Sequence, residues 1–183
     1  KITSKTKAVM AVHLYGHSCA MEELKKICKQ HKLFLIEDCA EAIGSRYKNR
    51  HVGTFGDVAV FSFYGNKTIT TGEGGMFMTN NKTLYQKAVH IKGQGLAKNR
   101  EYWHDVIGYN YRMTNVCAAL VMAQLEQVEK IIFRKRRIAK WYSEELNQAN
   151  IIFHPEAKDV FHSYWMCSIL IKESRNRDSL RSF

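Results

Sequence analysis

The chain has 183 residues, a length that fits one domain or one domain with part of a second. Its composition, 45% hydrophobic and 25% charged, is that of a soluble globular protein and excludes a disordered or fibrous chain. No apolar run reaches the ~20 residues that span a bilayer, and residues 1–9 lack a signal-peptide layout. We therefore expect a cytoplasmic protein with no membrane partner, whose net charge of +11 suits an anionic partner.

The first half of the chain alternates short apolar runs with helical patterns. Residues 8–14 form an apolar, β-branched run that predicts a buried strand. From Ala20 to His31 apolar residues recur at helical spacing. Further strands are predicted over 33–36, 57–64 and 76–79, and a helix over 81–90 with Asn81 as its N-cap. Strands that alternate with helices indicate an α/β fold.

The second half begins with a loop over residues 92–112. Thr114 or Asn115 then caps a long helical stretch that continues towards Leu146. Its expected apolar face consists of Ala118, Ala119, Val121, Met122, Leu125 and Val128. Residues 151–153 and 164–171 are predicted strands of another sheet, which would have too few strands to bury a core alone. We therefore expect a fragment or half of a longer protein.

A basic run falls within this helical stretch and consists of Lys130, Arg134, Lys135, Arg136, Arg137 and Lys140. It could bind nucleic acid, yet it carries no nucleic-acid-binding motif. The favoured interpretation is the solvated face of a helix whose apolar residues pack inward, namely Ile131, Ile132, Phe133 and Ile138. The five cysteines are scattered without a C-x-x-C pair, and the eight histidines show no metal spacing. We therefore expect free thiols and no metal site.

Three polar residues lie where an α/β sheet binds its ligands, beyond the carboxyl ends of the strands. Asp38 follows the run 33–36, Ser62 lies near the end of the run 57–64, and Lys67 comes five residues later. Each alone has an ordinary interpretation, as a cap, a satisfied hydroxyl or a surface charge. Together they match the needs of pyridoxal phosphate (PLP) catalysis: a carboxylate beside a pyridine nitrogen, an amine that forms an imine, and a hydroxyl for a phosphate.

Four stretches of the sequence, residues 6–18, 34–75, 93–130 and 162–166, resemble the DegT/DnrJ/EryC1/StrS sugar aminotransferases, most closely their perosamine-type branch. The resemblance covers almost the whole chain. It implies an α/β fold of the PLP-dependent transferase type I, like aspartate aminotransferase, with a mixed sheet and flanking helices, present here in part. Residues 1–130 would belong to the large PLP-binding domain and residues 131–183 to the start of the smaller C-terminal domain.

The resemblance also implies a role for each matching residue. Lys67 would be the catalytic lysine that forms the Schiff base, Asp38 would pair with the pyridinium nitrogen, and Ser62 would bind the phosphate. Glu41 stands where most of the family carries a glutamine that contacts the cofactor's phenolic oxygen. Asn110 resembles an asparagine that reaches the PLP phosphate of the neighbouring subunit, which implies a homodimer with shared active sites. Lysine at position 67, where sugar dehydratases of the family carry histidine, favours amino transfer.

The function so implied is PLP-dependent amination of a nucleotide-linked 4-keto-6-deoxy sugar for glycan biosynthesis, with glutamate as the amino donor. One alternative is a non-catalytic or truncated remnant that needs a partner chain, because a phosphate-binding turn of the family precedes the position of Lys1. Another is a nucleic-acid binder that uses Arg134–Arg137.

Two further groups are candidates to line the site. Tyr15, His13 and His17 follow the first strand, although histidines there are more often structural. Tyr109, Tyr111 and Arg112 could contact the nucleotide or serve only in loop packing.

Overall fold

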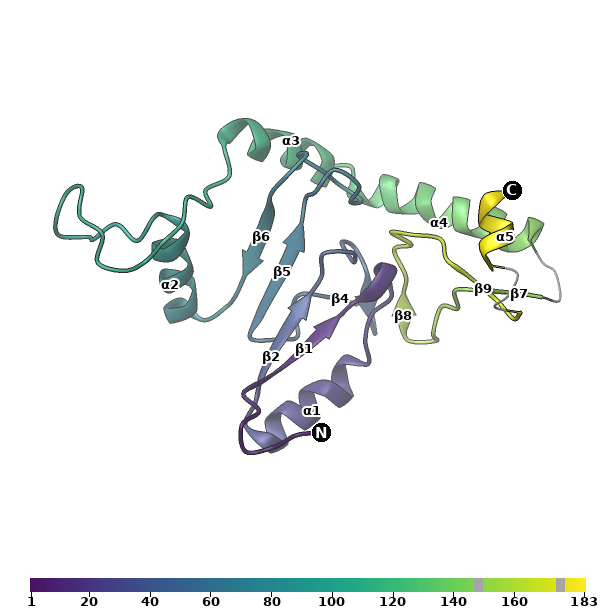
Figure 1. Cartoon of the computed structure of the whole chain (residues 1–183), viewed down its shortest axis with the longest axis horizontal. Helices are drawn as coiled ribbons and strands as arrows, with labels where there is room; N and C mark the ends of the chain where they lie inside the picture. The colour runs from purple at the N-terminus through teal and green to yellow at the C-terminus, as the bar shows by residue number, and fades with distance from the viewer. Residues whose placement is uncertain (147–149, 174–176) are drawn as a thin grey trace.

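A computed structural model describes residues 1–146, 150–173 and 177–183 and has a mixed four-stranded sheet at its centre (Figure 1). Strands β1 (Ala8–Val12), β2 (Phe34–Asp38) and β5 (Val58–Ser62) run parallel, and β6 (Gly75–Met78) runs antiparallel to β5. The strand order is β1-β2-β5-β6. The predicted α/β class and mixed sheet are confirmed, with strand ends shifted by one or two residues.

Helix α1 (Met21–His31) packs on one face of this sheet because its apolar side chains fall on one stripe. Met21 and Cys28 are buried, and they form a core cluster with Ala11, Leu35, Tyr47 and Val160. Helix α2 (Lys82–Lys92) follows β6, and its predicted cap is confirmed. The Asn81 side chain accepts hydrogen bonds from the backbone N–H groups of Thr83 and Leu84.

The predicted long helix is two helices, α3 (Asn115–Leu125) and α4 (Val128–Glu145), which lie in succession along the edge of the molecule (Figure 1). Thr114 is the cap, since its hydroxyl accepts from the Cys117 N–H. The expected apolar face of α3 is only partly correct: Val121 is buried, while Met122 is 56% exposed. Helix α3 is hydrophobic on all sides, so periodicity could not select the buried face.

The expectation for the basic run on α4 is also partly wrong. Ile132 is buried and Ile131 packs against the core, but Phe133 is 66% and Ile138 42% exposed. Arg136, expected on a solvated face, instead forms a 2.7 Å ion pair with Glu156. None of the helices in the three described ranges combines the length and the apolar character that a bilayer crossing requires.

Three two-residue strands that the sequence did not predict connect the C-terminal segment to the first half. Strand β3 (Arg46–Tyr47) pairs with both β4 (Arg50–His51) and β8 (Val160–Phe161). Strand β7 (Ile151–Phe153), as predicted, pairs in a second sheet with β9 (Ile169–Ile171). The first half of the predicted strand 164–171 is wrong, because Tyr164 has a φ of 50° and breaks the extended run. A short helix, α5 (Arg177–Ser182), ends the chain.

Candidate active site

The site lies at the carboxyl edge of the three parallel strands, where the loops after β1, β2 and β5 leave the sheet. The arrowheads of these three strands all point upwards and to the right in the view of Figure 1, as parallel pairing requires. A short 3-10 helix, η1 (Leu14–Gly16), follows β1. Because parallel strands end on the same edge, three loops that are distant in sequence meet there.

Lys67 and Glu41 are brought together at this edge. The Lys67 Nζ lies 3.8 Å from Glu41 Oε1, and the two side chains are 14% and 21% exposed. Glu41 Oε2 accepts a 2.7 Å hydrogen bond from the backbone N–H of Tyr15. The β1, β2 and β5 loops thus each contribute one residue to a connected group, with Glu41 between the other two.

The loop that carries Lys67 is held by its own turn and by α3. The Lys67 backbone N–H donates to the Tyr64 carbonyl at 3.0 Å. The Gln124 side chain of α3 pairs with the backbone of Thr70, accepting from its N–H at 3.0 Å and donating to its carbonyl at 2.7 Å. Ile69 is buried against Phe63 and Val121. This packing fixes the path of the loop on both sides of the lysine.

Trp165, from the C-terminal segment, covers Lys67. The Lys67 Nζ lies 4.0 Å from the centroid of the indole ring, within the range of a cation–π interaction. Apart from the resemblance of residues 162–166, no sequence pattern indicates this contact, because residues 67 and 165 are far apart along the chain and leave no local signal. Tyr15, by contrast, was among the residues named as candidates to line the site.

Asp38 and Ser62 lie at the ends of neighbouring strands of the same edge. Asp38 pairs in register with Val60 of β5, and Ser62 follows two residues later. One carboxylate oxygen of Asp38 accepts from the Ala40 N–H at 3.0 Å, and the Ser62 hydroxyl accepts from the Tyr64 N–H at 3.3 Å. Both side chains are half-buried.

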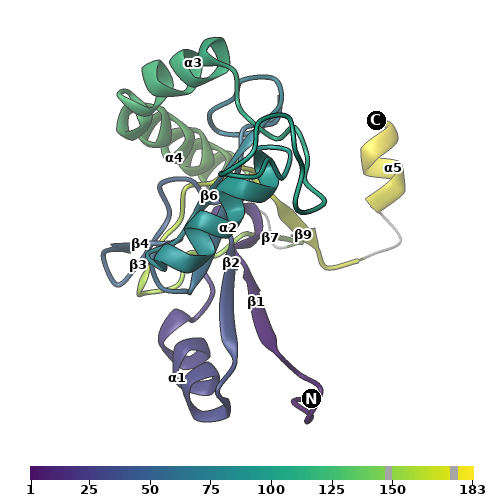
Figure 2. The same ribbon diagram turned by 90° about the vertical axis from the view of Figure 1, so that its left-hand side faces the viewer.

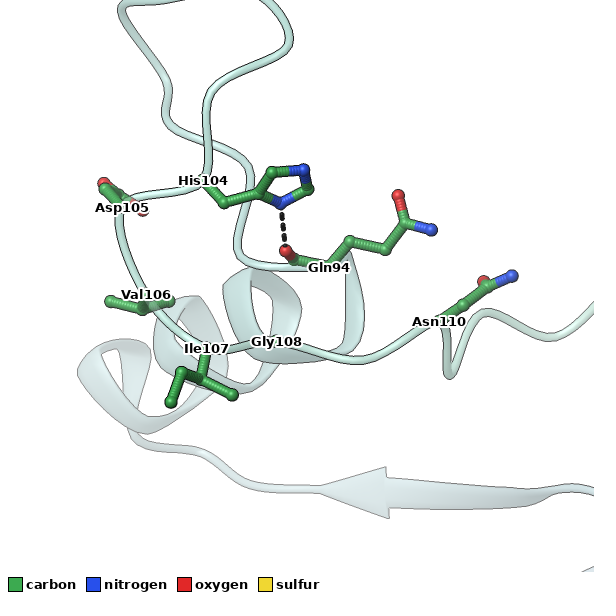
Figure 3. A pocket seen from close by; sticks show the side chains of 7 residues that line it. All are labelled: Gln94, His104, Asp105, Val106, Ile107, Gly108 and Asn110. Atoms are coloured by element: carbon green, nitrogen blue, oxygen red, sulfur yellow. Dashed lines mark hydrogen bonds between the residues drawn. The ribbon is translucent and has the colours of Figure 1, made fainter.

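Asn110 lies elsewhere, on the loop between α2 and α3. It is exposed and forms an isolated bridge with Gly93. Figure 3 shows it at the rim of a hollow of about 750 Å³ whose wall includes Gln94 and His104. In Figure 1 this loop projects away from the β8 side of the molecule. Within one chain, the structure therefore does not join Asn110 to the group around Lys67.

A second buried group flanks Asp38 on β2. The Glu37 carboxylate accepts hydrogen bonds from the backbone N–H groups of Gly53, Phe55 and Gly56 at 2.6 to 2.7 Å, and His13 Nε2 lies 3.2 Å away. Burial alone would raise the pKa of Glu37, but these hydrogen bonds lower it below its usual value. Glu37 thus remains a carboxylate that fastens the turn at 53–56 to the sheet.

Cys39 completes this group, since the ligand atoms of His13, Glu37 and Cys39 lie within 4.8 Å of one another. The sequence did not predict such a cluster, because its members lie at the ends of two different strands, β1 and β2. His13 Nδ1 accepts from the Cys19 N–H at 3.1 Å, so Nε2 carries the proton and donates to Glu37. Because N–H donors engage the lone pairs of His13 Nδ1 and of the Glu37 carboxylate, the arrangement suits a structural role.

Three histidines join the C-terminal segment to the η1 loop. The ring of His162 lies 4.7 Å from that of His154 and 5.3 Å from that of His17, and it stacks on Tyr164 at 3.8 Å. Burial and then the neighbouring His154 and His17 lower the pKa of His162 to about 3. The His162 ring is therefore neutral at physiological pH and packs as an aromatic group.

Comparison with known sequences gives one family for the whole chain. Residues 1–183 match the model of the DegT/DnrJ/EryC1/StrS aminotransferase family. The chain is 62% identical to GDP-perosamine synthase of Escherichia coli O157:H7 and 52% identical to that of Vibrio cholerae, in each case over 100% of the chain and 50% of the relative. The chain thus spans about half the length of these curated relatives.

Solved structures agree with this result. The Helicobacter pylori aminotransferase PseC, involved in the biosynthesis of pseudoaminic acid, is 30% identical, with a TM-score of 0.90 over 98% of this chain and 49% of its own. S. venezuelae DesV, solved in complex with a ketimine intermediate, is 31% identical, with a TM-score of 0.89 over 99% of this chain and 48% of its own. The expected fold is confirmed as about half of that of these enzymes, and the chain belongs to the DegT/DnrJ/EryC1/StrS aminotransferase family.

Proposed function

We propose that the protein containing this chain is a PLP-dependent aminotransferase that acts on a nucleotide-linked 4-keto-6-deoxy sugar, with glutamate as the amino donor. The observation that carries the proposal is the position of Lys67. Its amine is shielded from solvent, lies beside Glu41, and belongs to the same sheet edge as Asp38 and Ser62. The names of the relatives, GDP-perosamine synthases, support a sugar carried by a guanine nucleotide.

The donor set at this edge fits PLP by its chemistry. When bound, PLP supplies an aldehyde that reacts with amines and a ring that withdraws electrons from the bonded carbon. The Asp38 carboxylate would hold a proton on the ring nitrogen, and the Ser62 hydroxyl would donate to the phosphate. Lys67 would hold the cofactor covalently and then, as a free amine, move a proton on the substrate. Glu41 would orient that amine and face the ring's phenolic oxygen.

Two structural features of the assembly belong to the same proposal. Asn110 would complete the phosphate site of a second copy, which makes a homodimer with shared sites part of the function. Its exposed position, on a loop between α2 and α3 that projects away from the β8 side of the molecule, supports this assignment. We also propose that residues 1–130 are part of a large cofactor-binding domain and residues 131–183 the start of a smaller one.

The decisive experiment traps the cofactor on the lysine. The protein is mixed with PLP, reduced with borohydride, digested and analysed by mass spectrometry, with Lys67→Arg as the matched control. We expect the phosphopyridoxyl group on Lys67, and the yellow colour formed with PLP should fade on addition of glutamate. Label spread evenly over surface lysines, with none preferred at position 67, would contradict the proposal.

A second assay separates an active enzyme from a remnant that only binds the cofactor. The protein is supplied with PLP, glutamate and a GDP-linked 4-keto-6-deoxy sugar, and the aminated nucleotide sugar is measured by mass spectrometry. Product that forms with the original protein and not with Lys67→Arg supports the aminotransferase. Trapping at Lys67 without product would favour a remnant that needs a partner chain.

A further inference from the structure

The environment of the Lys67 amine is formed by one anionic group and one aromatic face. Its Nζ lies 3.8 Å from Glu41 Oε1 and 4.0 Å from the centroid of the Trp165 ring. A carboxylate attracts an ammonium by its charge, and an indole face attracts it by its quadrupole. Both contacts therefore hold the lysine side chain in this place.

Trp165 is itself fixed by three contacts from different parts of the chain. Its Nε1 donates a 2.9 Å hydrogen bond to the carbonyl of Asn66, the residue before Lys67. Its ring stacks on that of Tyr15 with centroids 6.1 Å apart and planes at 25°. Its backbone carbonyl accepts from Lys135 Nζ at 3.2 Å. The indole is thus tied directly to the loop that carries the lysine.

The backbone also fixes the approach of this segment. Gly16 has a φ of 98°, and a Cβ added there would lie 2.5 Å from Ser163 Oγ and 3.0 Å from the Tyr164 nitrogen. The Gly16 carbonyl accepts from the Ser163 N–H at 3.2 Å. Tyr164 is in the left-handed region, which turns the chain just before Trp165. Glycine at position 16 therefore allows the close contact that places the indole over Lys67.

From this geometry we propose that Trp165 is a positioning residue for Lys67, holding its free ammonium beside Glu41 whenever the lysine has no covalent partner. The inference deepens the proposed function and rests on it, because a lysine that is bonded and released in each cycle needs a defined resting position. Trp165 acts through the lysine.

The test measures the reactivity of Lys67 in the protein without PLP. Trace acetylation with acetic anhydride, followed by mass spectrometry, gives the rate at Lys67 relative to the exposed Lys25. We expect Trp165→Leu to raise this relative rate roughly ten-fold, since the lysine loses both the desolvated cation–π contact and the shielding of its amine by the indole ring. Trp165→Phe keeps an aromatic face and should restore a rate close to that of the original protein.

Trp103→Leu is the matched control. Its indole lies 4.0 Å from the Arg100 guanidinium, the same distance as at Trp165, but on the loop between α2 and α3. It should leave the Lys67 rate unchanged. Two results would overturn the proposal. An unchanged Lys67 rate in Trp165→Leu would show that the indole does not affect the lysine, and an equal rise at every lysine would indicate general loosening of the fold.

A second measurement needs no variant that must fold without the indole. In protein labelled with ¹³C-lysine, the ε-methylene signal that is lost in Lys67→Gln should be shifted upfield by the ring current of Trp165. An unshifted signal would overturn the proposal. Neither readout requires PLP, so a failure of cofactor trapping at Lys67 would refute the proposed function and leave the Trp165 contact supported.

Discussion

Replacement of Glu37 by glutamine should destabilise the protein strongly. The substitution keeps the size of the side chain but replaces one acceptor oxygen with an NH₂ group. If this group takes the place of Oε1 it faces the N–H groups of Phe55 and Gly56, and if it takes the place of Oε2 it faces those of Gly53 and His13. In either orientation two buried donors lose their acceptor.

Each unsatisfied buried donor costs about 1–3 kcal/mol. The expected loss is therefore ~2–6 kcal/mol, a large part of the ~5–15 kcal/mol that stabilises an ordinary domain. The matched control is Glu22→Gln, whose exposed ion pair with Lys48 is screened by solvent and should contribute little to stability. Both free energies of unfolding can be measured by urea denaturation followed by circular dichroism.

The stabilising effect of Glu37 should also depend on pH. Because the pKa of Glu37 is lowered in the folded state, its stabilising effect is present above the usual value of 4.5 and is lost as the pH falls through the folded value. The difference between the original protein and Glu37→Gln should therefore shrink in acid. A loss no greater than that of Glu22→Gln at neutral pH would refute the role assigned to this carboxylate.

Three further predictions concern a buried histidine, a glycine and a helix cap. His162 is held neutral, so the unfolded chain binds its proton first. Stability should fall by up to ~1.4 kcal/mol per pH unit from the usual 6.5 down to about 3, and a His162→Phe variant should lose this slope in pH-dependent urea titrations. Gly16→Ala should cost ~1–3 kcal/mol in thermal unfolding, because its Cβ would meet Ser163 Oγ at 2.5 Å in a left-handed backbone. Asn81→Ala should cost ~1 kcal/mol in the same assay through loss of the α2 cap, while Asn81→Asp should retain it.

The elements of the fold that the sequence predicts well are those whose signal is local. Short apolar runs predict the four strands of the main sheet, and Asn81 predicts the start of α2. Strands β3, β4 and β8 have two residues each, too short for a period to be read. The break between α3 and α4 lies at residues 126–127, inside a pattern that continues on both sides, and no glycine or proline marks it.

In the candidate site, too, the features with a local sequence signal are predictable and those that depend on tertiary packing are not. Asp38 and Ser62 lie at the ends of neighbouring strands, a position that can be read from the sequence because apolar runs mark where strands end. Lys67 lies on the loop after β5. The contact of Lys67 with Trp165 depends instead on how a segment 98 positions later returns to the sheet. Likewise, which side chains of α4 are buried depends on what packs against the helix, which explains the exposed Phe133. The cofactor-binding roles of Asp38, Glu41, Ser62, Lys67 and Asn110 remain predictions.

The Gly16 carbonyl accepts from the Ser45 hydroxyl at 2.6 Å and from the Ser163 N–H at 3.2 Å, while the two serine hydroxyls lie 2.8 Å apart. Ser45 and Ser163 are 118 positions apart along the chain. Contacts between residues so far apart in sequence form late in folding, since a long loop must close before they contribute. The parallel strands can therefore assemble first, and the covering of Lys67 becomes one of the last events on the way to the native state.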